Sequence, residues 1–195
     1  MMILARCLSL LAIFVLVCCG PAAQEGTHGG FTTPAPDGKI DGNLVETQSA
    51  IIGNTISVVA GRQQGTGLHA YAGIIPGQPV QVPLSGEAIF RGPYVTAFIE
   101  DITIEDNFVQ GRNSKLEGTI TLMTNLSELT LFGTDGVLTV RARISNNDTI
   151  SGEVEVLGVP GVLSGEVGED RAFGMFHGSD LTHVMSGGFV ASRQP

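Results

Sequence analysis

The stretch VLTVRARISNNDTISGEVEV, residues 137–156, decides the fold class. Apolar and polar residues alternate in both of its halves, which is the pattern of a β-strand with one dry face. The central Asn-Asn-Asp tolerates left-handed backbone angles and forms turns. We predict a hairpin with these facing pairs: Ile144 with Ile150, Val140 with Val154, and Arg141 with Glu153. One register then gives both a dry face and a charged face, as a stable hairpin requires.

The same alternation recurs along the chain, and no segment after residue 45 shows the apolar spacing of a helix. Clusters of Gly, Pro, Asn and Asp separate the strands. We predict further short strands near residues 57–60, 68–75, 86–91, 94–102, 116–123, 128–132, 162–167, 172–177 and 183–191. A type II turn is predicted at Val159-Pro160-Gly161-Val162, because Pro and Gly supply its two central backbone angles. Many short strands without a helix predict an antiparallel barrel or sandwich.

Glycine recurs at strand positions that are expected to face inward, namely Gly86, Gly118, Gly152, Gly165 and Gly187. A glycine inside a strand weakens it, so repeated use indicates the strong curvature of a narrow barrel. We predict an all-β fold, a soluble antiparallel barrel of about eight strands with a filled interior and a short N-terminal strand or handle region. Charged residues occupy the alternate strand positions, which disfavours a transmembrane barrel.

The first residues have the composition of an export signal. Arg6 precedes the apolar run Leu8–Val17, which is too short to span a bilayer and has the length of a signal-peptide core. The next residues, LVCCG at 16–20, resemble a bacterial lipobox. We therefore predict a lipoprotein signal peptide over residues 1–18 and lipid attachment, including palmitate, at Cys19.

A second cleavage position is open. Cleavage after Ala22 or Ala23 would give a soluble secreted or periplasmic product without cysteine. Residues 19–42 are rich in Pro, Gly and Thr and are predicted to form a flexible tether, with the barrel domain over residues 43–195. The net charge of −9 argues against nucleic acid as a partner, so a membrane would be reached through the lipid.

Several segments carry a resemblance to a known family. These are GVLTVRARISNNDTISGEVEV, GVLSGEVGEDRAFGMFHG and SGGFVAS near the C terminus, with YAGIIPG and GEAIFRGPY upstream. Over residues 68–192 the chain resembles the β-barrel of transferrin-binding protein B and related surface lipoproteins. The resemblance implies an eight-stranded barrel on a lipoprotein of the bacterial outer membrane, at the cell surface or on the periplasmic face. It also implies a protein, haem or metal-carrier ligand, but it identifies no ligand-binding residue.

Two histidines near the C terminus are the candidate metal ligands. In a hairpin centred on Asp180, His177 and His183 face each other and could share a zinc or copper ion. The alternative is a connecting loop with the histidines at its ends, because a closed metal site needs three or four ligands. We expect no cofactor.

Three weaker candidates remain. His69 and Tyr71 alternate on one strand face, as some haem ligands do, although exposed polar aromatic residues are commoner there. The acidic residues within 100–107 could bind calcium weakly or protect an edge strand by charge. Ser164 lies in VLSGEVG, which is not a nucleophile elbow. Because no nucleophile, base and orienting group fall on one site, we predict that the chain is not an enzyme.

Two function classes follow from the sequence. The first is an envelope-anchored, non-catalytic binding lipoprotein that displays loops, such as residues 76–85 and 105–115, to a host or environmental ligand. The second is a structural or adhesion module of the outer membrane surface with no small ligand. Apolar loop residues and an N-terminal handle sheet would favour the binding protein, whereas a uniformly polar surface would favour the structural module.

Overall fold

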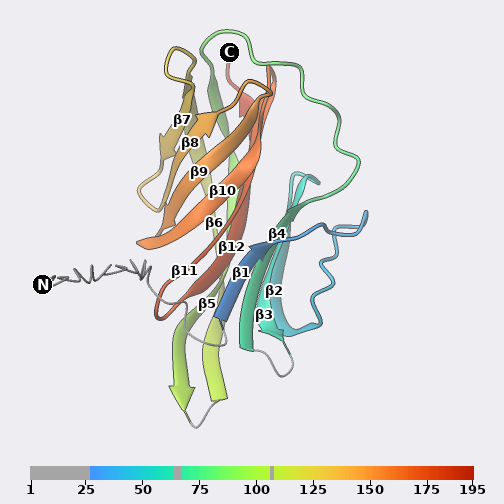
Figure 1. Cartoon of the computed structure of the whole chain (residues 1–195), viewed down its shortest axis with the longest axis vertical. Helices are drawn as coiled ribbons and strands as arrows, with labels where there is room; N and C mark the ends of the chain where they lie inside the picture. Colours follow the sequence, from blue (N-terminus) through green and yellow to red (C-terminus); the bar gives the residue numbers. More distant parts are fainter. Residues whose placement is uncertain (1–26, 64–66, 106–107) are drawn as a thin grey trace, which may run out of the picture.

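A computed structural model describes residues 27–63, 67–105 and 108–195, and all regular structure in these ranges is β-strand (Figure 1). The strands are β1 Thr27–Phe31, β2 Leu44–Ile52, β3 Ile56–Gln63, β4 Gly67–Ile74, β5 Ile89–Glu105, β6 Phe108–Asn125, β7 Thr130–Thr134, β8 Leu138–Ile144, β9 Thr149–Val156, β10 Val159–Val167, β11 Arg171–Ser179 and β12 Val184–Arg193. Within the described ranges, no helix has the length and apolar character needed to cross a membrane.

Strands β5 to β12 form a closed barrel in which every strand pairs antiparallel with the next one in sequence. The ring closes because β12 also pairs with β5. This confirms the prediction of an all-β antiparallel barrel. The hairpin of β8 and β9 has the predicted register, with Val140 opposite Val154 and Arg141 opposite Glu153.

Large side chains fill the interior of the barrel. The biggest fully buried ones include Tyr94, Phe90, Phe98, Phe176 and Phe189. Glycine opposite an aromatic ring makes room for this packing. A Cβ added at Gly118 would overlap the ring of Tyr94, and a Cβ added at Gly187 would overlap the ring of Phe176. The interior is therefore a packed core rather than a channel.

A second, four-stranded sheet has the order β1-β4-β3-β2 and lies against the outside of the barrel (Figure 1). Its inward residues, such as Val58, Ala60 and Ala70, pack against the outward faces of β5, β11 and β12. Small alanine side chains let the two layers approach closely. The predicted short N-terminal strand or handle region is thus a four-stranded sheet, and it covers one side of the barrel.

The predicted flexible tether was wrong for residues 27–42. Thr27–Phe31 is a strand that pairs with β4, and the hydroxyl of Ser57 donates a 2.5 Å hydrogen bond to the carbonyl oxygen of Gly38. Residues 27–42 are mostly small or polar, which is typical of a tether, but Thr27–Phe31 completes the edge of the handle sheet. The predicted strands at 57–60 and 68–75 likewise belong to the handle sheet and not to the barrel.

Other local predictions were also wrong. Residues 159–162 lie in β10, and the turn before them uses Leu157 and Gly158, with φ of 52° and 86°. Gly86 is not an inward strand residue but lies before β5 with φ of 70°. Residues 105–115 do not form a long loop, because β5 and β6 extend toward each other as a hairpin over most of this range.

Candidate functional site

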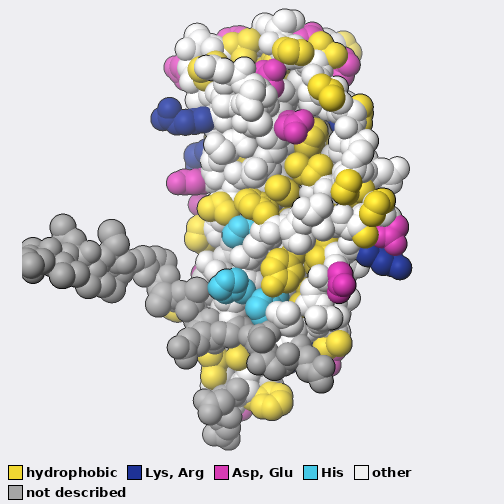
Figure 2. Space-filling view, turned by 45° about the vertical axis from the view of Figure 1, so that its right-hand side comes forward, with side chains coloured by type: hydrophobic (Ala, Val, Ile, Leu, Met, Phe, Trp, Pro, Cys, Tyr) yellow, Lys and Arg dark blue, Asp and Glu magenta, His cyan; other side chains and the backbone are white. Residues whose placement is uncertain are grey.

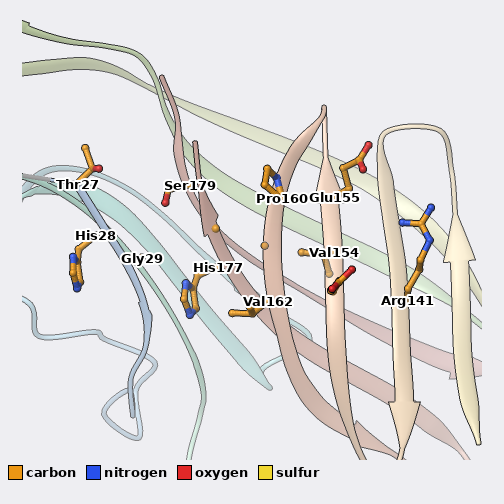
Figure 3. A pocket seen from close by; sticks show the side chains of 13 residues that line it. Thr27, His28, Gly29, Arg141, Val154, Glu155, Pro160, Val162, His177 and Ser179 are labelled. Carbon is orange, nitrogen blue, oxygen red and sulfur yellow. The ribbon is translucent and has the colours of Figure 1, made fainter. Parts of the chain in front are cut away.

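The candidate site is a groove between the handle sheet and the outer wall of the barrel. Its volume is about 530 Å³. The lining residues are Thr27, His28, Gly29, Arg141, Glu153, Val154, Glu155, Pro160, Gly161, Val162, His177, Gly178 and Ser179. Figure 3 shows β1 with His28 on one side, His177 and Val162 in the middle, and Glu155 and Arg141 at the far end. The groove thus joins a histidine-rich end to a charged end across an apolar strip.

A close contact between β1 and β11 forms the histidine-rich end. A Cβ added at Gly29 would stand 2.9 Å from Nδ1 of His177, so the absence of a side chain at Gly29 lets the imidazole lie against β1. The ring of Phe31 meets His177 edge-on with 4.6 Å between centroids. His177 therefore packs against β1 and joins the barrel wall to the handle sheet. Its other side borders the groove.

His28, which also lines the groove, lies beside a third histidine, His69, on one face of the handle sheet. His28 on β1 pairs in register with His69 on β4, and their ring centroids are 6.1 Å apart. The hydroxyl of Tyr71 lies 3.2 Å from Nδ1 of His69, and the two rings stack. Figure 2 shows histidine side chains gathered on one face beside hydrophobic ones. His69 and Tyr71 thus lie on one face of β4, as predicted, and their side chains contact each other.

The electrostatics of the groove keep His177 neutral. Burial lowers the pKa of His177, and the positive charge that His28 acquires on protonation lowers it further. At the far end, Arg141 faces Glu153 across the β8–β9 ladder. Glu155 instead has Thr139 and Pro160 as its cross-strand neighbours. The groove therefore carries an excess of one negative charge.

The predicted pairing of His177 with His183 was wrong. In the β11–β12 hairpin His177 faces Ser186, and His183 lies in the loop before β12. There Nδ1 of His183 lies 3.0 Å from Oδ1 of Asp180, which also accepts a 2.7 Å hydrogen bond from the N–H of Thr182. Within the described ranges, no group of three or more His, Cys, Asp and Glu side chains is arranged to hold a metal ion. The loop interpretation of His183 is the one that the geometry supports.

The remaining sequence candidates lie apart from the groove or have another role. Arg112 on β6 forms ion pairs with Glu100 at 2.8 Å and Asp101 at 3.3 Å on β5, which offset part of the negative charge of this acidic segment. Ser164 pairs with Met175 in the barrel wall. Cys19, the predicted lipid-attachment residue, lies outside the described residues.

Sequence reasoning found the two ends of the groove but not the groove itself. The alternation of apolar and polar residues puts Arg141 and Glu153 on the outward face of their hairpin. His177 is a candidate in the sequence only as a metal ligand. Residues 27–29 were assigned to a tether. The signal that could have found β1 is the THGGF segment, in which two glycines follow a histidine. Such a segment can lie close to another chain segment because it carries few side chains.

Comparison with known proteins gives neighbours in structure only. No family model and no curated protein sequence matches the chain. Transferrin-binding protein B from serogroup B Neisseria meningitidis is 13% identical with a TM-score of 0.45, and the match covers 80% of this chain and 37% of that one. The haemoglobin receptor HpuA from Kingella denitrificans is 12% identical with a TM-score of 0.42, covering 72% of this chain and 55% of the receptor.

A third neighbour is transferrin-binding protein B from Haemophilus parasuis, at 16% identity and a TM-score of 0.44, where 76% of this chain covers 37% of that one. The chain therefore spans between about a third and about a half of the length of these proteins. Transferrin-binding protein B is also the protein that the patterns of residues 68–192 resemble.

Proposed function

We propose that this chain is an envelope-anchored, non-catalytic binding lipoprotein that presents the outer surface of a small barrel to a host or environmental ligand. The observation that carries the proposal is the groove between β1 and the barrel wall, with His28 and His177 at one end and Arg141 and Glu155 at the other. It combines an apolar floor with a few convergent polar groups, which is the usual composition of a binding site.

The packed interior supports binding at the outer surface. Tyr94, Phe90 and Phe176 fill the barrel, so side chains occupy the space in which wider barrels hold a ligand. The handle sheet adds a second layer whose edge creates the groove. A ligand would therefore be recognised beside the handle or at the loops.

Exposed apolar side chains at the ends of the molecule are a second support. Val80 in the segment before β5 is 96% exposed, and Phe108 and Leu181 are 67% and 68% exposed. Val80 and Leu181 lie in loops and Phe108 begins β6, and exposed apolar residues of this kind, together with a handle sheet, favour a binding protein over a uniformly polar structural module. The ligand classes that fit the proposal are a protein, a haem or a metal carrier.

The lipid anchor at Cys19 completes the proposal. The apolar run before Cys19 and the LVCCG segment support export and lipidation of the chain at the bacterial outer membrane. The anchor would hold an acidic domain at a membrane that its own charge does not favour.

The test is recovery of the full chain from the outer membrane of its host after mild cross-linking. Mass spectrometry then identifies what is attached. The proposal expects a recurrent protein, haem or metal carrier, and expects substitutions in the groove or the loops to reduce its recovery. Repeated recovery of the chain alone would contradict a binding role and favour the structural or adhesion module.

A further inference from the structure

Among the described strands, β1 lies at one edge of the handle sheet, and its Gly29–Phe31 part is suited to receive another strand. β1 pairs with β4 in parallel, and it is a terminal strand of its sheet. In a parallel ladder, the N–H and C=O groups of one residue point to the same side of the strand, and those of the next residue point to the opposite side. The N–H of Thr32 donates to the carbonyl oxygen of Ala72 at 3.0 Å, so the N–H groups of Gly29 and Phe31 point away from β4. These groups form an edge that an extended segment can pair with.

The opposite edge of the sheet is blocked. The register of β2 shifts between Val45 and Gln48, and Glu46 has a φ of 51°, which together mark a bulge. The side chain of Asn113 also donates to the carbonyl oxygen of Glu46. Bulges and covering side chains prevent strand addition. The contrast with β1 is clear, because the Gly29–Gly30 pair leaves its backbone open.

The barrel wall beside β1 offers a floor for an added strand. The handle sheet covers the outer faces of β11, β12 and β5 and ends at β1. The next strip of wall carries Val162, which is 48% exposed, and Pro160. Because paired strands lie about 4.8 Å apart, a strand added to β1 would lie over this strip, between the labelled β1 residues and Val162 in Figure 3.

The charge of the groove selects among extended segments. Arg141 has Glu153 opposite it, whereas the cross-strand neighbours of Glu155 are uncharged. The chain as a whole has a net charge of −9. A basic side chain near Glu155 is therefore favoured, and an acidic one is repelled.

We propose that the edge of β1 binds an extended segment of the partner polypeptide as an added strand, with apolar side chains on Val162 and a basic side chain at Glu155. The inference rests on the proposed function, because it names the class of ligand that the binding lipoprotein takes. The pairing groups belong to Gly29 and Phe31, so a complementary segment of about five or six residues would span them with one or two residues on either side.

The experiment uses the full chain and the acetylated and amidated peptide Thr-Val-Thr-Val-Thr-Lys, in which the valines and the lysine share the face that lies on the barrel wall. Binding is followed by titration, and hydrogen exchange of individual backbone amides is measured by NMR. The expected result is saturable binding with slowed exchange at Gly29 and Phe31. The variant Glu155→Lys should weaken the binding of this peptide about tenfold and favour the same peptide with its lysine replaced by glutamate. The matched control Glu128→Lys, at an exposed position outside the groove, should leave binding unchanged.

Three results would overturn the inference. The first is equal binding of a peptide with its second valine replaced by proline, because that change removes backbone pairing but keeps the charge. The second is binding that Glu155→Lys does not alter. The third is slow exchange at Gly29 and Phe31 in the free protein. If this protection depends on protein concentration, a second copy occupies the edge; if it does not, a segment of the same chain does.

The peptide experiment and the test of the proposed function can fail independently of each other. A ligand recovered from the host and retained fully by Glu155→Lys and Val162→Lys would leave the binding function standing and remove the groove as its site. Peptide binding at β1, together with repeated recovery of the chain alone from the host, would support β1 as a strand-binding edge and contradict the proposed binding function.

Discussion

The hydroxyl of Tyr94, inside the barrel, donates a 2.8 Å hydrogen bond to Oδ2 of Asp135 in the turn between β7 and β8. The other carboxylate oxygen, Oδ1, accepts hydrogen bonds from the N–H groups of Val137 and Leu138 at 2.9 and 2.8 Å. One aspartate thus organises a turn and connects it to the aromatic core.

Tyr94→Phe removes this connection without changing the shape of the ring. We expect a loss of about 1–3 kcal/mol in the free energy of unfolding, because the Tyr94 side chain is buried and the acceptor of its hydrogen bond is charged. Urea denaturation measures it. The control Tyr71→Phe removes a hydroxyl on the handle sheet, and it should cost less because that side chain is only partly buried. Equal losses in the two variants would contradict a special role for the Tyr94 hydroxyl.

The acid sensitivity of the barrel should depend on the same pair. Burial by itself raises the pKa of Asp135, but hydrogen bonds from Leu138 and Tyr94 outweigh it and leave the pKa below its usual value. A carboxylate with a lowered folded pKa stabilises the fold above the unfolded value of about 3.9, and this stabilisation is lost as pH falls through the folded pKa. Tyr94→Phe should therefore lose less stability than the parent protein between about pH 5 and pH 2.

His177 should give a second, separate pH dependence. Because burial and His28 lower its pKa, the folded protein keeps His177 neutral where the unfolded chain already binds a proton. Stability should therefore fall as pH drops below the unfolded value of about 6.5 and level off below the folded pKa. Melting temperatures of the parent and His177→Gln, compared at pH 7.5 and 5.0, measure the effect. A parallel pH dependence in the two proteins would contradict it.

Gly187→Val tests the crowding of the closing strand. The added side chain would overlap the ring of Phe176 and approach the carbonyl oxygen of Val95 to 2.8 Å at its Cβ. We expect a loss of about 1–3 kcal/mol in stability, which thermal or urea unfolding would detect. Ser151→Val, at an exposed position on β9, is the control and should be close to neutral. An unchanged melting temperature for Gly187→Val would show that the barrel accommodates the side chain by a shift.

Cys19→Ala tests the proposed anchor. The variant should appear in the soluble fraction, whereas the parent chain stays with membranes, and metabolic labelling with palmitate should be lost. Cys18→Ala is the matched control and should retain both the label and the membrane association. Membrane retention of Cys19→Ala would contradict lipidation at this residue, whereas a parent chain found in the soluble fraction without the label would favour cleavage after Ala22 or Ala23.

The predicted strand register was correct where apolar and polar residues alternate clearly. In β8 and β9 one face is dry and the other is charged, so only one register satisfies both, and the predicted pairs are the observed ones. The β11–β12 hairpin lacks that contrast. Both faces of β12 are buried over most of its length, because the handle sheet covers the outside. A prediction centred on Asp180 therefore shifted the register of His177.

The strand pairing of the handle sheet could not be predicted, because it joins segments that are far apart in the sequence. β1 is short and rich in glycine, and its partner β4 lies far along the chain. The groove depends on that pairing and on the contact between Gly29 and His177, and no local sequence pattern encodes either. The charged end of the groove was easier to anticipate, because Arg141 and Glu153 belong to the hairpin with the strongest alternation.

The parallel pairing of β1 with β4 affects the order in which the chain can fold. Thr27 lies opposite Leu68, so β1 emerges from the ribosome or an export channel before the strand that it pairs with has been delivered. During that interval its open backbone remains available to any chaperone or neighbouring chain that pairs with extended segments. β1 can therefore join the handle sheet only after β4 has been delivered, and a delay at this step would prolong its exposure to aggregation.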